Sequence, residues 1–259
     1  MPDEPAHSRP FARTTLLALL AILIAGLSLR LFDVNWDQGK NLHPDELFVS
    51  GRAVDVINAA HERGWSDLLD PELSPINPRS KTCDDGRNYC NYSYGALPLL
   101  VVDGSAQILK ELTGTNYTGF DEIKIVGRKM SAMVDTVTIL LIFLLATRLF
   151  GQGVGLLSAA TYAATPLAIQ LSHFFTTDIW LAFFVTLTLW CALLALERER
   201  HGWFMLAGFT FGLALATKGS VILLAGVVAL SALYLGWRRL DPQDPIDAIL
   251  GTLSRWIVA

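Results

Sequence analysis

The sequence predicts an all-α membrane protein with about six transmembrane helices and a long extracytoplasmic first loop that contains interfacial helices. Hydrophobic residues make up 52% of the 259-residue chain and charged residues only 17%, whereas a soluble domain carries about a quarter charged residues. The charges lie between long apolar runs, and one connection between these runs is far longer than the others. No basic run of the kind that binds nucleic acid is present, and the formal net charge is only -4.

The apolar runs lie at 14–32, 130–146, 154–171, 179–196, 203–217 and 220–237. A bilayer core of about 30 Å needs about 20 helical residues, so most of these runs are long enough to span it. The fifth run is short, and it completes a span only with its flanks or where the bilayer thins. The first run resembles a signal peptide, but Arg30 and two large apolar residues stand where a cleavage site needs small residues, which favours an uncleaved span.

Basic residues are unevenly distributed between the two ends of the runs. The second, fourth and sixth runs are followed by Arg148, Arg198, Arg200, Arg238 and Arg239. Cytoplasmic connections carry this excess of Lys and Arg. We therefore expect a cytoplasmic tail at 1–13, a first span at 14–32, an extracytoplasmic loop at 33–125, spans two to six within 126–237, and a cytoplasmic segment at 238–259 that leads toward a seventh span.

The first loop contains two helical patterns. Apolar residues recur at helical spacing over 45–64, and the apolar stretch that begins at 97 continues as an interfacial helix to 112. A turn-rich segment at 70–94 separates the two helices. It contains Cys83 and Cys90, which we expect to form a disulfide on the oxidising side of the membrane.

Ionisable residues stand at every outer junction of the predicted bundle. They are His43, Asp45 and Glu46 after the first run, Arg128 before the second, His173 and Asp178 between the third and fourth, and Lys218 between the fifth and sixth. Each acid has a structural explanation as well, because acids favour the first turn of a helix. Ionisable groups at membrane depth cost a few kcal/mol each, so a set of mixed charge indicates a shared, water-accessible cavity.

This set of groups suits one kind of chemistry. A carboxylate acts as general base toward an acceptor hydroxyl, and cations bind a phosphate leaving group. The residues therefore point to sugar transfer from a lipid-linked phosphate donor. Two alternatives stay open: a transporter or flippase for a lipid-linked substrate, and a non-catalytic scaffold subunit.

Four motifs, in order along the chain, resemble the GT-C superfamily of membrane glycosyltransferases, in particular its protein O-mannosyltransferase and lipid A aminoarabinose transferase branch. HPDE at 43–46 resembles the acidic motif that follows the first span there. The segments 126–151, 172–184 (SHFFTTDIWLAFF) and 212–224 (GLALATKGSVILL) resemble three later motifs of bacterial members. Members have eleven or more spans, so we expect this chain to be a fragment, a truncated product or half of a split enzyme.

The resemblance implies a polyprenyl- or dolichyl-phosphate sugar as donor, a protein, lipid or glycan as acceptor, and inversion at the anomeric carbon. Asp45 would be the catalytic base, and Glu46 and Asp178 would orient the acceptor or hold Asp45. Arg128 and Lys218 would contact the donor phosphate, while His43 and His173 would orient substrate or serve structurally. No metal is required, although Asp45 and Asp178 would share one if a divalent ion were used. The site would face the outside of a bacterial or archaeal cell membrane, or the lumen of the endoplasmic reticulum.

Overall fold

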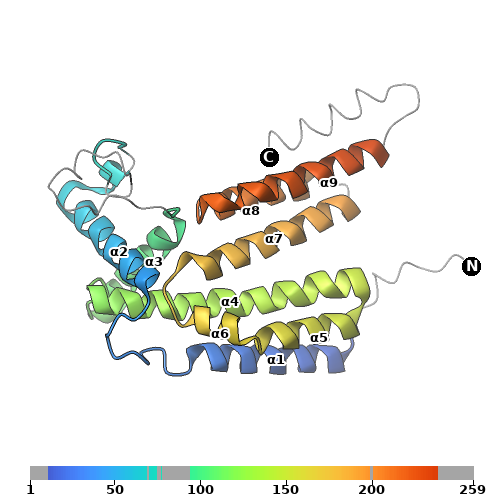
Figure 1. Cartoon of the computed structure of the whole chain (residues 1–259), viewed down its shortest axis with the longest axis horizontal. Helices are drawn as coiled ribbons and strands as arrows, with labels where there is room; N and C mark the ends of the chain where they lie inside the picture. Colours follow the sequence, from blue (N-terminus) through green and yellow to red (C-terminus); the bar gives the residue numbers. More distant parts are fainter. Residues whose placement is uncertain (1–10, 69, 75–76, 78–93, 199–200, 239–259) are drawn as a thin grey trace, which may run out of the picture. The chain divides into compact units, whose positions relative to one another are not determined.

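A computed structural model describes residues 11–68, 70–74, 77, 94–198 and 201–238 of the chain (Figure 1). Every regular element in these ranges is a helix, which agrees with the all-α prediction. Cys83 and Cys90 lie outside the described residues, so their disulfide stays a prediction.

The described helices are of three kinds. The long ones are α1 (Arg13–Leu31), α2 (Pro44–Arg63), α4 (Phe120–Phe150) and α7 (Thr177–Arg198), and those of intermediate length are α3 (Leu97–Thr113), α8 (His201–Leu215) and α9 (Leu224–Arg238). The short ones are η1 (Trp65–Leu68), α5 (Gln152–Ala163), α6 (Pro166–Ser172) and η3 (Gly219–Leu223).

Three described helices, α1, α4 and α7, are long and apolar enough to cross a membrane. The pair α5 and α6 adds a fourth span if it is counted as one broken helix, with a bend of 57°. Helices α8 and α9 are apolar but have only 15 residues each. The chain therefore has three or four span-capable helices in its described part, and the count of six stays a prediction.

The run at 154–171, predicted as one span, is divided in the structure. Helix α5 ends at Ala163, and Thr165 takes the extended conformation with φ −68° and ψ 116° before Pro166 opens α6. Proline has no N–H and disfavours a helical conformation in the residue before it, so a helix cannot continue unbroken through this point. The break follows directly from Pro166.

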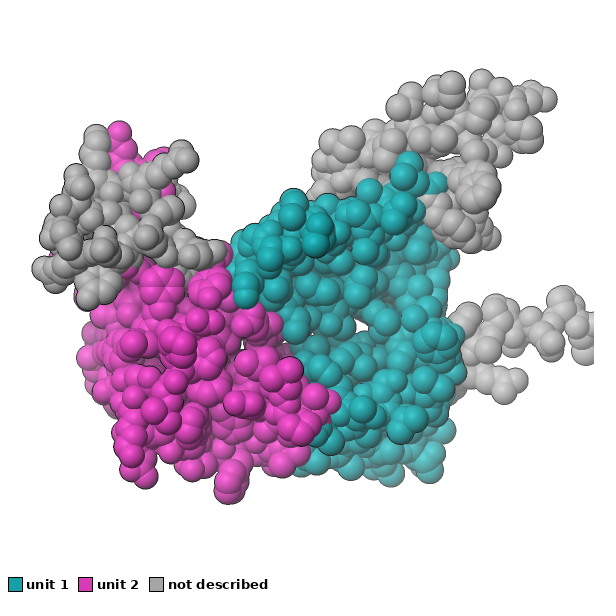
Figure 2. Space-filling model, viewed as in Figure 1, with its two compact units in different colours: residues 1–26, 136–164, 181–259 teal, residues 27–135, 165–180 magenta. Residues whose placement is uncertain are grey.

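The chain forms two compact units, shown in different colours in Figure 2. Unit 1 contains residues 1–26, 136–164 and 181–259, and its core cluster consists of Leu19, Ile139, Phe143, Ala159 and Ala163. Gly155 allows α5 to approach α4 closely here, because a Cβ at this position would overlap the side chain of Thr147.

Unit 2 contains residues 27–135 and 165–180. Helix α2 occurs where helical periodicity predicts it, and α3 occurs where the apolar stretch that begins at 97 predicts it. The two helices pack against each other. Each contributes a buried apolar face, with Val49, Ala53 and Val56 on α2 and Leu99, Val102 and Ala106 on α3. This unit also contains most of the residues predicted to form the functional site.

Candidate functional site

A buried ion cluster connects the start of α2 with α4. The guanidinium of Arg128, on α4, lies between the carboxylates of Glu46 and Asp37, and none of the three side chains reaches solvent. Arg128 Nε and Nη2 donate to the two oxygens of Glu46 at 2.7 and 2.6 Å. Its Nη1 and Nη2 donate to the two oxygens of Asp37 at 3.0 and 2.9 Å. Two bidentate pairs of this kind hold the guanidinium in one orientation and compensate its positive charge.

All five N–H groups of Arg128 have acceptors, because Nη1 also donates to the carbonyl oxygen of Val34 at 2.9 Å. A guanidinium has five donors and no more. The phosphate contact predicted for Arg128 would therefore require one of these buried bonds to break. In this structure the arginine positions two carboxylates.

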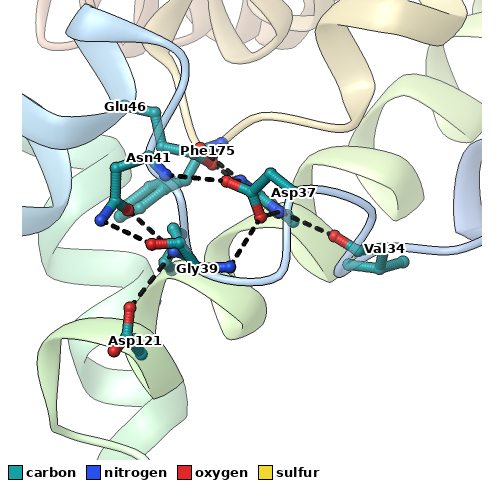
Figure 3. Close-up of polar contacts among 9 residues, drawn as sticks. Val34, Asp37, Gly39, Asn41, Glu46, Asp121 and Phe175 are labelled. Atoms are coloured by element: carbon teal, nitrogen blue, oxygen red, sulfur yellow. Dashed lines mark hydrogen bonds and ion pairs between the residues drawn. The ribbon is translucent and has the colours of Figure 1, made fainter.

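Besides binding Arg128, Asp37 stabilises a turn (Figure 3). Its carboxylate accepts hydrogen bonds from the backbone N–H of Gly39 at 3.3 Å and of Asn41 at 3.2 Å. The turn places Asp33, Gln38 and Asn41 at positive φ, where short polar residues are tolerated best. The hydrogen bonds from Arg128 lower the pKa of Asp37 to about 2, so this carboxylate stays ionised.

Glu46 is held equally firmly. It occupies the first turn of α2, behind Pro44, where negative charge is favoured. Besides the two bonds from Arg128, its Oε1 accepts the backbone N–H of Phe175 at 2.7 Å. Glu46 thus connects the start of α2 with the segment between α6 and α7. This connection gives Glu46 a structural role.

Asp45 lies beside Glu46 in the first turn of α2 and differs from it in burial and in hydrogen bonding. Its side chain is half-buried. Within the ranges that the structure describes, no hydrogen bond or ion pair engages its carboxylate. The helix start thus carries two adjacent acids, of which Glu46 is bound on both oxygens and Asp45 is available.

The two histidines lie in the same unit as Asp45. The ring of His43 packs on Phe174 at a centroid distance of 4.5 Å, and its Nδ1 is buried without a partner among the described residues. His173 follows α6, with Nδ1 2.7 Å from the carbonyl oxygen of Ile169 and Nε2 2.8 Å from that of Phe32. Both ring nitrogens of His173 thus face backbone, which favours its structural alternative.

The remaining predicted residues are placed as follows. Asp178 lies in the first turn of α7, half-buried, and belongs to unit 2. Lys218 precedes η3 and belongs to unit 1, so its relation to Asp45 stays a prediction. Among the described residues no three acids, histidines or cysteines are grouped as a metal site would require.

Two buried features are not predicted from the sequence: Asp37 and the ion pair of Arg30 with Asp135. Arg30 Nε lies 2.6 Å from Asp135 Oδ2, with neither side chain exposed. The available signal was the isolated acid Asp135 inside an apolar run, since a charge at that depth needs a partner. Asp37 offered no such signal, because it stands in a polar, aperiodic segment.

The apolar helices of spanning length are those of an integral membrane protein, and the start of α2 carries a buried ion cluster. A family profile of dolichyl-phosphate-mannose-protein mannosyltransferases matches residues 116–254, just over half of the chain. The chain therefore belongs to this family of membrane glycosyltransferases, as its motifs predicted. A comparison with curated protein sequences finds no match.

Proposed function

We propose that the protein transfers a sugar from a polyprenyl- or dolichyl-phosphate donor to a hydroxyl acceptor outside the cytoplasm, with Asp45 as general base. The observation that carries this proposal is the contrast between the two acids of the α2 start. Glu46 is fixed by Arg128 and Phe175, whereas no described residue forms a hydrogen bond or ion pair with the carboxylate of the adjacent Asp45. A general base needs such an available carboxylate on a rigid support.

The proposed reaction forms and breaks one bond at the anomeric carbon. The acceptor hydroxyl gives its proton to the Asp45 carboxylate as its oxygen bonds to that carbon. The bond from the anomeric carbon to the phosphate oxygen breaks, and the lipid phosphate leaves from the opposite face, so the configuration inverts. Asp178 is proposed to orient the acceptor, and Lys218 is proposed to stabilise the leaving phosphate.

The Glu46–Arg128–Asp37 cluster has a positioning role in this proposal. It connects α2, α4, the turn at 33–41 and the start of the segment that leads into α7. This buried connection holds the backbone of Asp45 at one distance from the surrounding elements. A protein hydroxyl, a lipid or a glycan each satisfies the acceptor chemistry, and a mannosyl donor is the first to test because of the family.

The test is a transfer assay with the complete gene product that contains this sequence. Membranes are supplied with radiolabelled polyprenyl-phosphate sugars, mannose first, and with peptide, lipid and glycan acceptors. We expect Asp45→Asn to lower the rate by about 10²–10⁴-fold without changing the amount of folded protein. Glu62→Gln, an exposed acid near the other end of α2, is the matched control and should transfer normally.

Two results would contradict the proposal. Unchanged transfer by Asp45→Asn would remove the general base. Absence of transfer from every donor, with folded protein present in the membrane, would favour the transporter or scaffold alternatives.

A further inference from the structure

A large pocket lies between α3, the N-terminal half of α4 and the turn that contains Asp37. Its volume is about 840 Å³, within the range of ligand sites. Much of its lining is apolar, with Ile108 and Leu109 from α3 and Val126, Met130 and Met133 from α4. Asp45 does not line it, so the pocket is separate from the proposed reaction centre.

Four charged residues of α4 line the pocket, and the two acids, Asp121 and Glu122, precede the two lysines, Lys124 and Lys129. Glu122 lies in the first turn of the helix, and Lys129 follows seven residues later, about 10 Å along the axis. Met130 and Met133 come next, at the entry to the apolar part of the helix. From the polar end toward the membrane, the pocket thus presents an acid, a cation and then an apolar surface.

Both charged groups are available for a ligand. Glu122 and Lys129 are exposed, and within the described part of the chain neither side chain has a hydrogen bond or an ion pair. The other lysine of the pocket, Lys124, is occupied, because its Nζ donates to Asn41 Oδ1 at 2.8 Å and to Asp121 Oδ1 at 3.3 Å. Besides the paired Asp121 and Lys124, the pocket therefore offers one carboxylate and one ammonium group, those of Glu122 and Lys129, that no described residue binds.

We propose that this pocket binds a phospholipid with a phosphoethanolamine headgroup. The lipid's phosphate would accept from Lys129, and its terminal ammonium would donate to Glu122. Its acyl chains would cover Met130 and Met133, on the membrane side of both charges. In a bilayer the phosphate of such a lipid lies between the ammonium and the chains, which is the order in which α4 presents their partners.

Charge complementarity favours this lipid over other occupants. A polyprenyl phosphate has no ammonium group for Glu122, and a purely anionic headgroup would leave that acid facing another negative charge. The pocket also shares its wall with the ion cluster, since Gly39 lines it and donates to Asp37. A bound lipid would support the turn that holds Arg128.

The test is native mass spectrometry of the full-length protein in detergent, titrated with four probes. They are dioleoyl phosphatidylethanolamine, the matched phosphatidylglycerol and phosphatidylcholine, and a polyprenyl phosphate. We expect the ethanolamine lipid to bind most tightly and Lys129→Gln to weaken it about tenfold, the effect of losing one charge-assisted hydrogen bond. Glu122→Gln should abolish the preference for the ethanolamine lipid over phosphatidylglycerol.

Matched controls come from the neighbouring helix. Lys110→Gln and Glu111→Gln remove the same two charges from exposed positions of α3 that do not line the pocket, and they should bind like the wild type. Thermal unfolding without added lipid checks that all four variants are folded. Asp45→Asn should keep full lipid affinity, so this inference can fail or succeed separately from the proposed transfer reaction.

Three outcomes would overturn the proposal. They are equal retention of the three phospholipids, pocket variants that behave like the α3 controls, and displacement of the ethanolamine lipid by polyprenyl phosphate at equal concentration.

Discussion

Arg128 is the residue on which the local structure of the site depends. A buried guanidinium is tolerable only when its charge and its five donors are all satisfied, and here Glu46, Asp37 and Val34 satisfy them. Removing one partner of such a pair leaves an uncompensated buried charge. The cluster therefore makes the position of the α2 start, which carries Asp45, dependent on Arg128 and Asp37.

Asp103 is the opposite case, a buried acid with no compensation. It lies on α3 with its side chain fully buried, and neither carboxylate oxygen has a partner among the described residues. Burial raises the pKa of Asp103 to about 8 from an ordinary value of 3.8. The folded protein therefore keeps a proton that the unfolded chain loses above about pH 4.

This difference predicts a pH dependence of stability with a definite sign. The contribution of Asp103 to the free energy of unfolding is fully present below about pH 4. It is lost as the pH rises from about 4 to about 8, at no more than roughly 1.4 kcal/mol per pH unit. Asp103→Asn should remove that loss and raise the melting temperature at pH 8 more than at pH 5. Glu111→Gln, exposed on the same helix, should change neither value.

Thermal unfolding in detergent at the two pH values measures the effect. If the melting temperature changed equally between pH 5 and pH 8 in Asp103→Asn and in the wild type, the raised pKa of Asp103 would be contradicted.

At the scale of elements, the predicted and the observed structure agree where a local pattern decides the outcome. Helical periodicity was sufficient for α2, since an amphipathic repeat reports which face is buried, and the apolar stretch that begins at 97 was sufficient for α3. The break between α5 and α6 also has a local cause, Pro166, although the run at 154–171 was predicted as one span. The ion cluster was not predictable in this way, because Asp37 and Glu46 lie 91 and 82 residues from Arg128 along the chain.

The contact of α4 with the segment before α7 depends on Gly127. A Cβ at this position would overlap the ring of Phe175, whose backbone N–H donates to Glu46. Gly127→Ala should therefore lower the free energy of unfolding by about 1–3 kcal/mol through overpacking. Gly104→Ala is the matched control, because nothing lies within 4 Å of a Cβ there and alanine favours a helix over glycine by roughly 0.5–1 kcal/mol.

Thermal unfolding of the two glycine variants separates packing from helix propensity. If both variants were stabilised, the close approach of α4 to Phe175 would be wrong. A loss of stability in Gly127→Ala that Phe175→Leu partly restores would locate the overlap at that ring.

At the scale of the whole molecule, the sequence predicts which end of each helix faces the cytoplasm. Arg148 and the other basic residues that follow alternate runs indicate the cytoplasmic ends. In unit 1, Arg148 forms an ion pair with Glu197 at 2.6 Å. The described helices give the lengths and apolarity of the spans. Their orientation in the membrane depends on the basic residues at their ends, not on how the helices pack.

Accessibility of engineered cysteines tests this orientation. Glu111→Cys lies on α3, in the loop predicted outside, and Gly153→Cys lies at the start of α5, in a connection predicted inside. Both positions are exposed, and a Cβ at Gly153 meets nothing within 4 Å. The background carries Cys83→Ser and Cys90→Ser, whereas Cys191 is buried and is retained.

In intact cells, a membrane-impermeant maleimide should label Glu111→Cys and leave Gly153→Cys unlabelled, and permeabilisation should allow both to react. The reverse pattern would place the loop at 33–125, and with it Asp45, in the cytoplasm. A base at Asp45 would then act on a cytoplasmic acceptor, so the sidedness of this one loop decides which molecules the proposed transferase can reach.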